Sequence, residues 1–327
     1  MSMKRVIVTG GSGFVGACLT RTLLTEGHEV HLVVRPGFNP WRLEAIRDQV
    51  RLHLADLNDM EALQQMVGQV KPDWVFHLAT YGAYSHQADM RTALDTNFTG
   101  TINLVEACLK PGFEVFINTG SSSEYGFKDH PPTEDEMVEP NSFYAVGKAS
   151  ATLFGRFTAQ RLDVAITTLR LYSAYGPYEE PTRLIPALLI NGLEGKLPPL
   201  VNPDIARDYI YVDDVVRAFI TAARNPDRVK GQVFNVGTGI QLSLREVVET
   251  VRRHFEITTE PQWGSMENRQ WDTSIWVADN TKIRQELGWQ PQYTFEQGFR
   301  ATTDWLSQNP ALLDYYRNKL VAKRNNQ

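Results

Sequence analysis

Short apolar runs alternate with amphipathic stretches along the first 170 residues or so of this chain. Helical periodicity is found at 14–26, 58–69, 92–109 and 143–161. Apolar residues dominate the runs between these stretches, which is typical of strands buried on both faces of a parallel sheet. The runs are RVIVTG, EVHLVVR, VRLHLAD, DWVFHLA, EVFINTG and VAITTLRL. Strict alternation of strand and helix predicts an α/β fold with a doubly wound parallel sheet.

The segment VTGGSGFVG lies at the end of the first predicted strand and at the start of the first helix. In this context Gly10 permits a tight turn, Gly13 lets the backbone approach a pyrophosphate, and Gly16 lets the helix pack on the strand. The N–H groups at the helix start, around Phe14 and Val15, would then face the phosphates. The pattern predicts a dinucleotide cofactor.

The end of the second strand bears on which dinucleotide is bound. Sites for NAD usually carry an acid there to bind the ribose hydroxyls, whereas this chain has Val34 and Arg35. A guanidinium attracts a 2′-phosphate, so Arg35, with Arg42 as a second candidate, predicts NADP. NAD stays open as an alternative, with Arg35 stacking on adenine.

Further cofactor contacts are expected at the ends of the third and fourth strands. These residues are Asp56 and Leu57 in HLADL, and Leu78 and Ala79 in HLAT.

A tyrosine and a lysine share one helix face in SFYAVGKAS, because Tyr144 and Lys148 are four residues apart. Reduction of a ketone needs a proton donor at the developing alkoxide, and a nearby lysine is expected to lower the pKa of the tyrosine. Ser121 follows the run EVFINTG and can hold the carbonyl oxygen. We therefore predict Ser121, Tyr144 and Lys148 as the catalytic residues.

After residue 172 the pattern becomes irregular and richer in proline, although RDYIYVDDVVRAFITAAR and QVFNVGTG suggest returns to the sheet. We expect a dinucleotide-binding domain at 1–172 with returns at about 205–238. A smaller C-terminal substrate-binding lobe would comprise 173–204 and 239–327.

The charge and composition of the chain limit the classes of partner that it can bind. The net charge of −5 and the lack of a basic stripe argue against nucleic acid. No apolar stretch approaches about 18 residues, and MSMKRVIVTGG holds too short an apolar run for a signal peptide. Cys18 and Cys108 fall in predicted helices and are expected to be buried and reduced. We expect a cytoplasmic protein without a membrane segment or metal site.

Taken together, these motifs resemble the extended short-chain dehydrogenase/reductase family of nucleotide-sugar epimerases, dehydratases and reductases, which has a Rossmann fold. The resemblance covers nearly the whole chain. It rests on TGGSGFVG, HLA, NFTGTINLVEAC, Ser121, YAVGK, LRLYSAYGP, RDYIYVDDV, FNVGTG and VADNTKIRQELGWQP.

The resemblance implies further roles. Arg207 and Arg269 would clamp the diphosphate of a nucleotide sugar, because guanidinium grips phosphate bidentately. Asn97 would fix the backbone near the lysine. Substrate contacts are also implied for Ser122, Ser123 and Ser173, the last of which replaces a family asparagine. Members commonly form homodimers through the helices at 92–109 and 143–161.

Within the family, dehydratases place an acid two positions after the catalytic hydroxyl. That position is Ser123 here, and Glu124 lies one residue further, on the opposite face of an extended backbone. The motif GSSSEYG and the late region ENRQWDTSIWVADNTKI resemble nucleotide-sugar 4-ketoreductases such as GDP-4-keto-6-deoxymannose reductase and CDP-abequose synthase. The expected function is NADPH-dependent reduction of a nucleotide-linked 4-keto-6-deoxyhexose. The alternatives are an NAD-dependent 4-epimerase, then a 4,6-dehydratase or a non-catalytic dinucleotide sensor.

Overall fold

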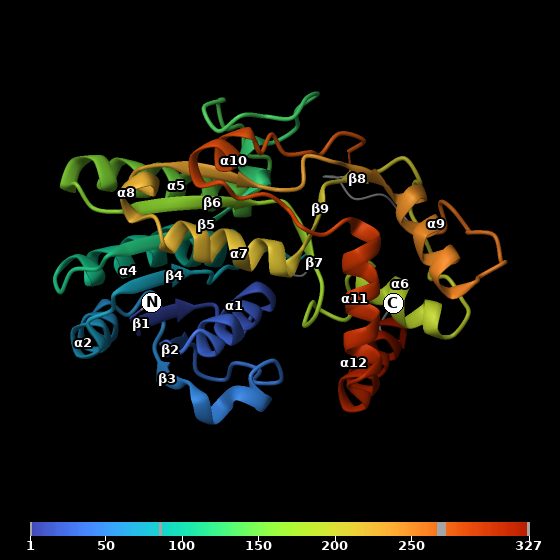
Figure 1. The fold of residues 1–327 in the computed structure, drawn as a ribbon, viewed down its shortest axis with the longest axis horizontal. Helices are drawn as coiled ribbons and strands as arrows, with labels where there is room; N and C mark the ends of the chain where they lie inside the picture. Colours follow the sequence, from blue (N-terminus) through green and yellow to red (C-terminus); the bar gives the residue numbers. More distant parts are fainter. Residues whose placement is uncertain (1, 85–86, 267–272, 326–327) are drawn as a thin grey trace.

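A seven-stranded parallel sheet forms the centre of the molecule, in a computed structural model that describes residues 2–84, 87–266 and 273–325. The strand order is β10-β6-β5-β4-β1-β2-β3 (Figure 1). The strands are β1 Arg5–Thr9, β2 Glu29–Val34, β3 Arg51–Leu54, β4 Trp74–His77, β5 Val115–Ser121, β6 Ile166–Leu171 and β10 Val233–Val236. The predicted doubly wound sheet is confirmed, and the strand order reverses between β1 and β4, where such sheets bind ligands.

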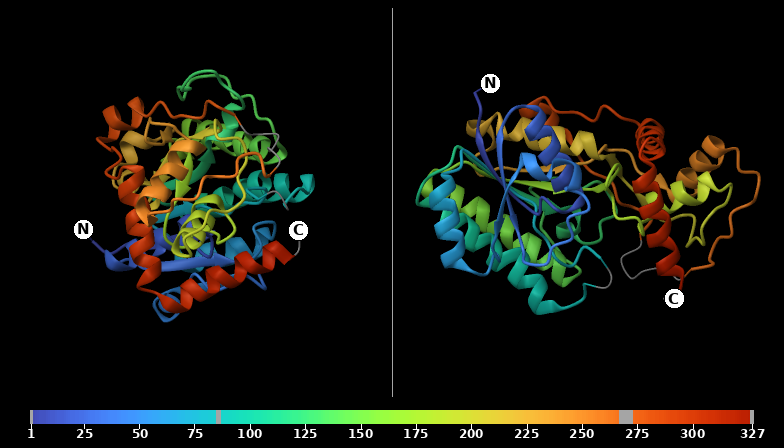
Figure 2. Two further views of the ribbon diagram at one scale, coloured as in Figure 1. Left: turned by 90° about the vertical axis from the view of Figure 1, so that its right-hand side faces the viewer. Right: turned by 90° about the horizontal axis from the view of Figure 1, so that it is seen from below.

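Helices cover both faces of the sheet, as Figure 2 shows. On one face lie α1 (Phe14–Thr25) and α7 (Val212–Ala223); on the other lie α2 (Met60–Val70), α4 (Gly100–Leu109) and α5 (Phe143–Leu162). Alternate side chains of each strand pack on opposite faces of the sheet, because side-chain direction alternates along a strand. In β1, Val6 and Val8 join the core that includes α1, whereas Ile7 joins the core that includes α2.

Short polar side chains fix the starts of several helices. Asp59 accepts a hydrogen bond from the N–H of Ala62 at the start of α2, and Ser142 accepts one from Ala145 at the start of α5. The helix expected at 92–109 is interrupted. It consists of α3 (Met90–Leu94) and α4, joined by a wider π-helical turn at Asp95–Thr99.

Beyond residue 172 the chain forms two small sheets. β7 (Ser173–Tyr175) pairs with β9 (Tyr209–Tyr211), and β8 (Ala206–Arg207) pairs with β11 (Leu242–Ser243). Of the two expected returns to the large sheet, QVFNVGTG joins it as β10, whereas RDYIYV does not, because β9 pairs with β7 instead.

The remaining helices include one group beside the small sheets and two short helices near β10 (Figure 1). They are α6 Leu184–Leu193, α9 Leu244–Phe255, α11 Phe295–Ser307 and α12 Pro310–Asn325, with α8 Pro226–Val229 and α10 Thr281–Leu287. Their buried apolar side chains form one continuous cluster with those of α1 and α7. Both cysteines are buried, as expected. Within the described ranges, no helix combines the length and the apolar character that crossing a membrane requires.

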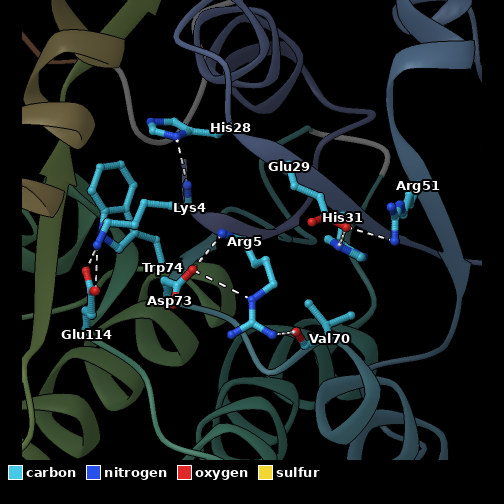
Figure 3. A network of polar contacts seen from close by, with 10 residues as sticks. All are labelled: Lys4, Arg5, His28, Glu29, His31, Arg51, Val70, Asp73, Trp74 and Glu114. Carbon is cyan, nitrogen blue, oxygen red and sulfur yellow. Dashed lines mark hydrogen bonds and ion pairs between the residues drawn. The ribbon is translucent and has the colours of Figure 1, made fainter. Parts of the chain in front are cut away.

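Polar contacts join the starts of the strands, at the edge of the sheet opposite the predicted site (Figure 3). Lys4 Nζ lies 2.6 Å from Glu114 Oε1, and the indole N–H of Trp74 donates to Glu114 Oε2 at 3.1 Å. Asp73 Oδ2 accepts a hydrogen bond from the N–H of Arg5 at 2.7 Å. These contacts link the amino ends of β1, β4 and β5 without using the turns at the carboxyl edge.

Candidate active site

The turn between β1 and α1 touches the end of β4 directly. Gly10 has a φ of +69°, and a Cβ there would lie 2.5 Å from the nitrogen of Ala79 and 2.6 Å from the carbonyl oxygen of Leu78. A Cβ at Gly16 would collide with the carbonyl oxygen of Gly10. Only glycine fits these two positions, for the reasons of turn geometry and close packing that the sequence predicts.

The amino end of α1 fits a phosphate group. Gly13 is the N-cap of α1 and carries no side chain to occupy the first N–H groups of the helix. Phe14 and Val15 form its first turn and are partly buried. Free N–H groups and the positive end of the helix dipole together attract anions.

The two arginines after β2 differ in their surroundings. Arg35 is exposed immediately beyond the strand. Arg42 is buried, and its guanidinium donates to the carbonyl oxygen of Tyr178 at 2.7 Å and pairs with Glu180 at 3.3 Å. The contribution of Arg42 to an NADP site stays a prediction; in this structure its donors join chain segments, and one of them reaches the carbonyl oxygen of Ser12 in the glycine turn at 3.4 Å.

The other predicted cofactor residues lie at the carboxyl ends of β3 and β4. Asp56 is exposed, and its carboxylate accepts the N–H of Asn58 at 2.9 Å. Leu57 and Leu78 are buried, and Ala79 is partly buried against Gly10. The glycine turn and the end of β4 thus meet at the point where the strand order reverses.

Asn97 is buried in the π-helical turn and holds the segment that follows β4. Its Oδ1 accepts hydrogen bonds from Thr80 Oγ1 at 2.9 Å and from the N–H of Tyr81 at 3.1 Å, while its Nδ2 donates to the carbonyl oxygen of Tyr81 at 2.7 Å. It also lies against Gly147, next to Lys148. Asn97 therefore fixes the backbone of Tyr81 and packs against the residue before Lys148.

Ser121, Tyr144 and Lys148 come together at the carboxyl end of β5. Ser121 ends that strand, and Tyr144 is the second residue of α5, with its hydroxyl near the hydroxyls of Ser121 and Thr80. Lys148 is buried, and its Nζ donates to the carbonyl oxygen of Thr119 at 3.0 Å. The three predicted catalytic residues form one cluster.

Burial dominates the electrostatics of this cluster. Burial raises the pKa of Tyr144, while hydrogen bonding to Ser121 and the nearby charge of Arg183 act in the opposite direction. Burial also lowers the pKa of Lys148 to about 8, against the attraction of Glu124. The expectation that Lys148 leaves Tyr144 with a lowered pKa is corrected, because burial outweighs the groups that favour the phenolate.

Glu124 is fully buried, and its carboxylate is held by Arg170 and by the backbone of Ser121. Its Oε2 accepts a hydrogen bond from Arg170 Nε at 2.9 Å, and its Oε1 accepts one from the N–H of Ser121 at 2.9 Å. Residues Ser122–Tyr125 form a short 3₁₀ helix, so the alternation of an extended strand is not the reason for its direction. The reciprocal cap between Ser121 and Glu124, together with Arg170, fixes the carboxylate.

A tryptophan that the sequence did not single out lies beside the serine turn. The indole N–H of Trp276 donates to Ser122 Oγ at 3.1 Å, and the guanidinium carbon of Arg207 lies 5.3 Å from a Trp276 ring centroid. Ser123 and Ser173 are partly buried, the latter on β7. Arg269 lies outside the described residues. Trp276 thus links two predicted substrate residues from a distant part of the chain.

Two hollows adjoin this region. One, of about 20 Å³, is bordered by Ser122 and Trp276; a larger one, of about 520 Å³, lies between residues 127–130 and Thr273–Ile275. In the part of the chain that the structure describes, no group of three His, Cys, Asp or Glu side chains is arranged to hold a metal ion.

The chain is similar to known proteins over most of its length. The model of the NAD dependent epimerase/dehydratase family matches residues 6–237. A dTDP-glucose 4,6-dehydratase of Streptomyces griseus is 33% identical over 316 residues, which cover 92% of this chain and 93% of the relative. A UDP-glucose 4-epimerase of Mycolicibacterium smegmatis is 30% identical over 329 residues, which cover 96% of this chain and 99% of the relative.

Solved structures show the same fold. The UDP-glucose 4-epimerase of Thermotoga maritima, determined with UDP-glucose, superposes with a TM-score of 0.83 at 26% identity over 93% of this chain and 98% of that one. The dTDP-glucose 4,6-dehydratase of Bacillus anthracis, in complex with NAD, gives a TM-score of 0.83 at 25% identity over 95% and 99%. With its glycine turn, its strand order and these matches, the chain belongs to the NAD dependent epimerase/dehydratase family.

Proposed function

We propose that this chain is an NADP-dependent enzyme that reduces the 4-keto group of a nucleotide-linked 4-keto-6-deoxyhexose. The observation that carries the proposal is the turn after β5. Ser122 and Ser123 carry hydroxyls there, and the carboxylate of the next residue, Glu124, is buried against Arg170. Elimination of water needs a base at C5 of the sugar, and a hydroxyl is too weak a base for that proton. Reduction needs only a proton donor and a group that holds the keto oxygen.

The residues of the cluster can supply both needs. In this proposal Ser121 donates a hydrogen bond to the keto oxygen, and Tyr144 delivers its proton to the same oxygen. Lys148 favours the phenolate that remains, because it is a buried cation one helical turn away. When bound, the cofactor supplies the hydride.

The protonation state of Tyr144 suits a donor of a proton to a keto oxygen. Its pKa is raised by burial, so the phenol keeps its proton at neutral pH and is ready to donate it.

For the cofactor, we assign the glycine turn, the amino end of α1 and the ends of the neighbouring strands. The exposed Arg35 after β2 supports NADP over NAD, since no acid stands there to repel a 2′-phosphate. The assigned residues are Gly10, Gly13, Phe14, Val15, Gly16, Arg35, Asp56, Leu57, Leu78, Ala79, Asn97, Tyr144 and Lys148.

For the substrate, we assign the lobe formed by 173–204 and 239–327, against the dinucleotide-binding part at 1–172 and about 205–238. Arg207 and Arg269 are proposed to bind the diphosphate. Ser122, Ser123 and Ser173 are proposed to bind the sugar and the atoms next to it.

An NAD-dependent 4-epimerase is the second candidate. It is favoured by the 30% identity to a UDP-glucose 4-epimerase over nearly the full length of both chains. The two candidates differ in cofactor use, because an epimerase regenerates its cofactor in each turnover whereas a reductase consumes a hydride.

The test is to incubate the protein with NADPH and 4-keto-6-deoxy sugars linked to GDP, CDP, dTDP or UDP. Loss of the absorbance of reduced cofactor with one of these substrates is expected. Incubation of GDP-mannose, CDP-glucose and dTDP-glucose with a trace of NADP, followed by mass spectrometry, tests the dehydratase. A product lighter by one water would overturn the proposal, and so would tight NAD binding with C4 inversion and no net oxidation of NADPH.

A further inference from the structure

The segment after β4 packs directly against Tyr144. Gly82 has a φ of +97°, and a Cβ at this position would lie 3.0 Å from Cβ of Tyr144. The N–H of Gly82 donates to Oε1 of Gln87 at 3.0 Å, which holds the turn in this place. Thr80 lies two residues before Gly82, and the hydrogen bonds between Asn97 and Tyr81 fix the backbone between them.

The hydrogen bonds of Asn97 set the direction of the Thr80 hydroxyl. Asn97 Oδ1 accepts from the N–H of Tyr81 and Nδ2 donates to its carbonyl oxygen, so the orientation of the amide is determined by its neighbours. Thr80 Oγ1, 2.9 Å from Oδ1, must therefore donate its one proton to Asn97. The lone pairs of Thr80 are left to accept a hydrogen bond, and the Tyr144 hydroxyl lies nearby.

We propose that Thr80 is a positioning residue for Tyr144: it accepts a hydrogen bond from the phenol at rest and donates one to the phenolate after proton transfer. The proposal rests on the proposed reduction. The transferred proton goes from Tyr144 to the substrate oxygen, while Thr80 keeps its own proton and turns its O–H from Asn97 to the phenolate. Asn97 Oδ1 keeps the hydrogen bond from Tyr81 during this turn, so no buried acceptor is left without a partner.

The electrostatics of Tyr144 agree with this role. Burial raises its pKa, whereas hydrogen bonding to Ser121 and to Thr80 lowers it. With Thr80 as one partner of the phenolate, Ser121 is free to direct its own hydroxyl at the substrate oxygen. In this proposal the Thr80 hydroxyl stabilises the phenolate, and the Ser121 hydroxyl binds the substrate oxygen.

The first experiment asks whether the contact exists and needs no substrate. The protein is labelled with ¹³Cζ-tyrosine, and the resonance of Tyr144 is identified by its loss in Tyr144→Phe. Thr80→Val should shift this resonance at neutral pH, and Thr80→Ser should restore it. Thr152→Val is the matched control on the same helix as Tyr144: among the described residues, the buried Thr152 hydroxyl has no hydrogen-bond partner to lose.

The second experiment asks whether the contact serves the reaction. Thr80→Val should lower kcat for keto reduction by about 3- to 10-fold, the worth of one hydrogen bond, with KM nearly unchanged. In the reverse direction, the pH midpoint of alcohol oxidation should rise by about half to one unit. Thr80→Ser should restore both values, and Thr152→Val should change neither.

The outcomes separate the two proposals. A Tyr144 resonance that does not move in Thr80→Val overturns the role of Thr80, even in an active reductase. A shifted resonance in a protein that reduces no keto sugar upholds the contact and overturns the proposed function. Thr80→Ala, checked by circular dichroism, replaces Thr80→Val if the valine variant does not fold.

Discussion

At the scale of single residues, the proposed chemistry depends most on Tyr144, whose place at the start of α5 is set by the Ser142 cap. Tyr144→Phe removes the proton donor and should lower turnover by about 10²- to 10⁴-fold, the usual contribution of one general acid. Cofactor binding should survive, because the lost hydroxyl faces the substrate, and titration calorimetry can measure it. Ser121→Ala should cost less, about 1–3 kcal/mol, because it removes one hydrogen bond. Full activity in Tyr144→Phe would move the chemistry to another residue.

We expect the choice between NADP and NAD to depend on Arg35. Arg35→Asp replaces an exposed cation after β2 with the acid that NAD sites use, so the ratio of NADPH to NADH affinity should fall. Fluorescence titration with both reduced cofactors measures this ratio. Arg47→Asp, on the following 3₁₀ helix Glu44–Gln49, makes the same charge change as a control. Equal affinity of the unchanged protein for both cofactors would contradict the assignment and favour the epimerase.

Glu179 gives the stability of the protein a pH dependence. Burial raises the pKa of its carboxyl from 4.5 to about 8, although Arg183 acts against this shift. Because the folded state holds this proton more tightly than the unfolded state, the contribution is complete below about pH 4.5 and is lost as the pH rises through about 8. Glu179→Gln keeps the shape and removes the titration. Relative to this variant, the unchanged protein should lose up to roughly 1.4 kcal/mol of unfolding free energy per pH unit between those values. Urea unfolding of both proteins at pH 5, 6.5 and 8 measures the difference. If the unfolding free energies of the two proteins change with pH in the same way, Glu179 is not the cause.

The sequence predicted those site residues that lie within short motifs. Gly10, Gly16, Ser121 and the Tyr144–Lys148 pair were found because their chemistry depends on local spacing. Thr80 and Trp276 were not found, because their partners lie far away along the chain: Trp276 meets Ser122 across 154 positions. No local pattern records such a contact.

At the scale of elements, the turn between β1 and α1 is rigid for two separable reasons. Gly10 has a positive φ, and a Cβ there would also press on the end of β4. Gly27 has a similar φ of +79°, but a Cβ there would meet nothing within 4 Å. Gly27→Ala should therefore cost about 1 kcal/mol from strain alone, whereas Gly10→Ala should cost several times more and weaken cofactor binding. Urea unfolding of both variants provides the measurement, and equal losses would mean that contact with β4 is unimportant.

The order of strands and helices could be predicted because each apolar run has the period of its element. The π-helical turn at Asp95–Thr99 could not be predicted, because it contains Asn97, whose side chain binds the segment after β4. β9 was assigned to the wrong sheet for a related reason. An apolar strand pattern shows that a strand is buried, but not which neighbour it pairs with.

At the scale of the whole molecule, α5 presents apolar side chains to solvent. Val146, Leu153 and Phe157 are 38%, 57% and 65% exposed and follow one face of the helix. We expect this face to be covered in a homodimer, as in relatives of the family the sequence resembles. Phe157→Glu should convert the dimer to a monomer, as measured by light scattering at micromolar concentration. Ile240→Glu, at a residue 67% exposed elsewhere, is the control. A monomer in the unchanged protein would contradict the expectation.

The contacts between strand starts in Figure 3 have a consequence for how such a protein can diverge. Lys4, Asp73 and Glu114 fix which strands begin side by side, and none of them belongs to the turns that form the candidate site. Changes in those turns can therefore accumulate through descent without altering the frame that carries them. The substrate or the reaction of such a protein can therefore change in the turns, while the contacts at the opposite edge of the sheet stay the same.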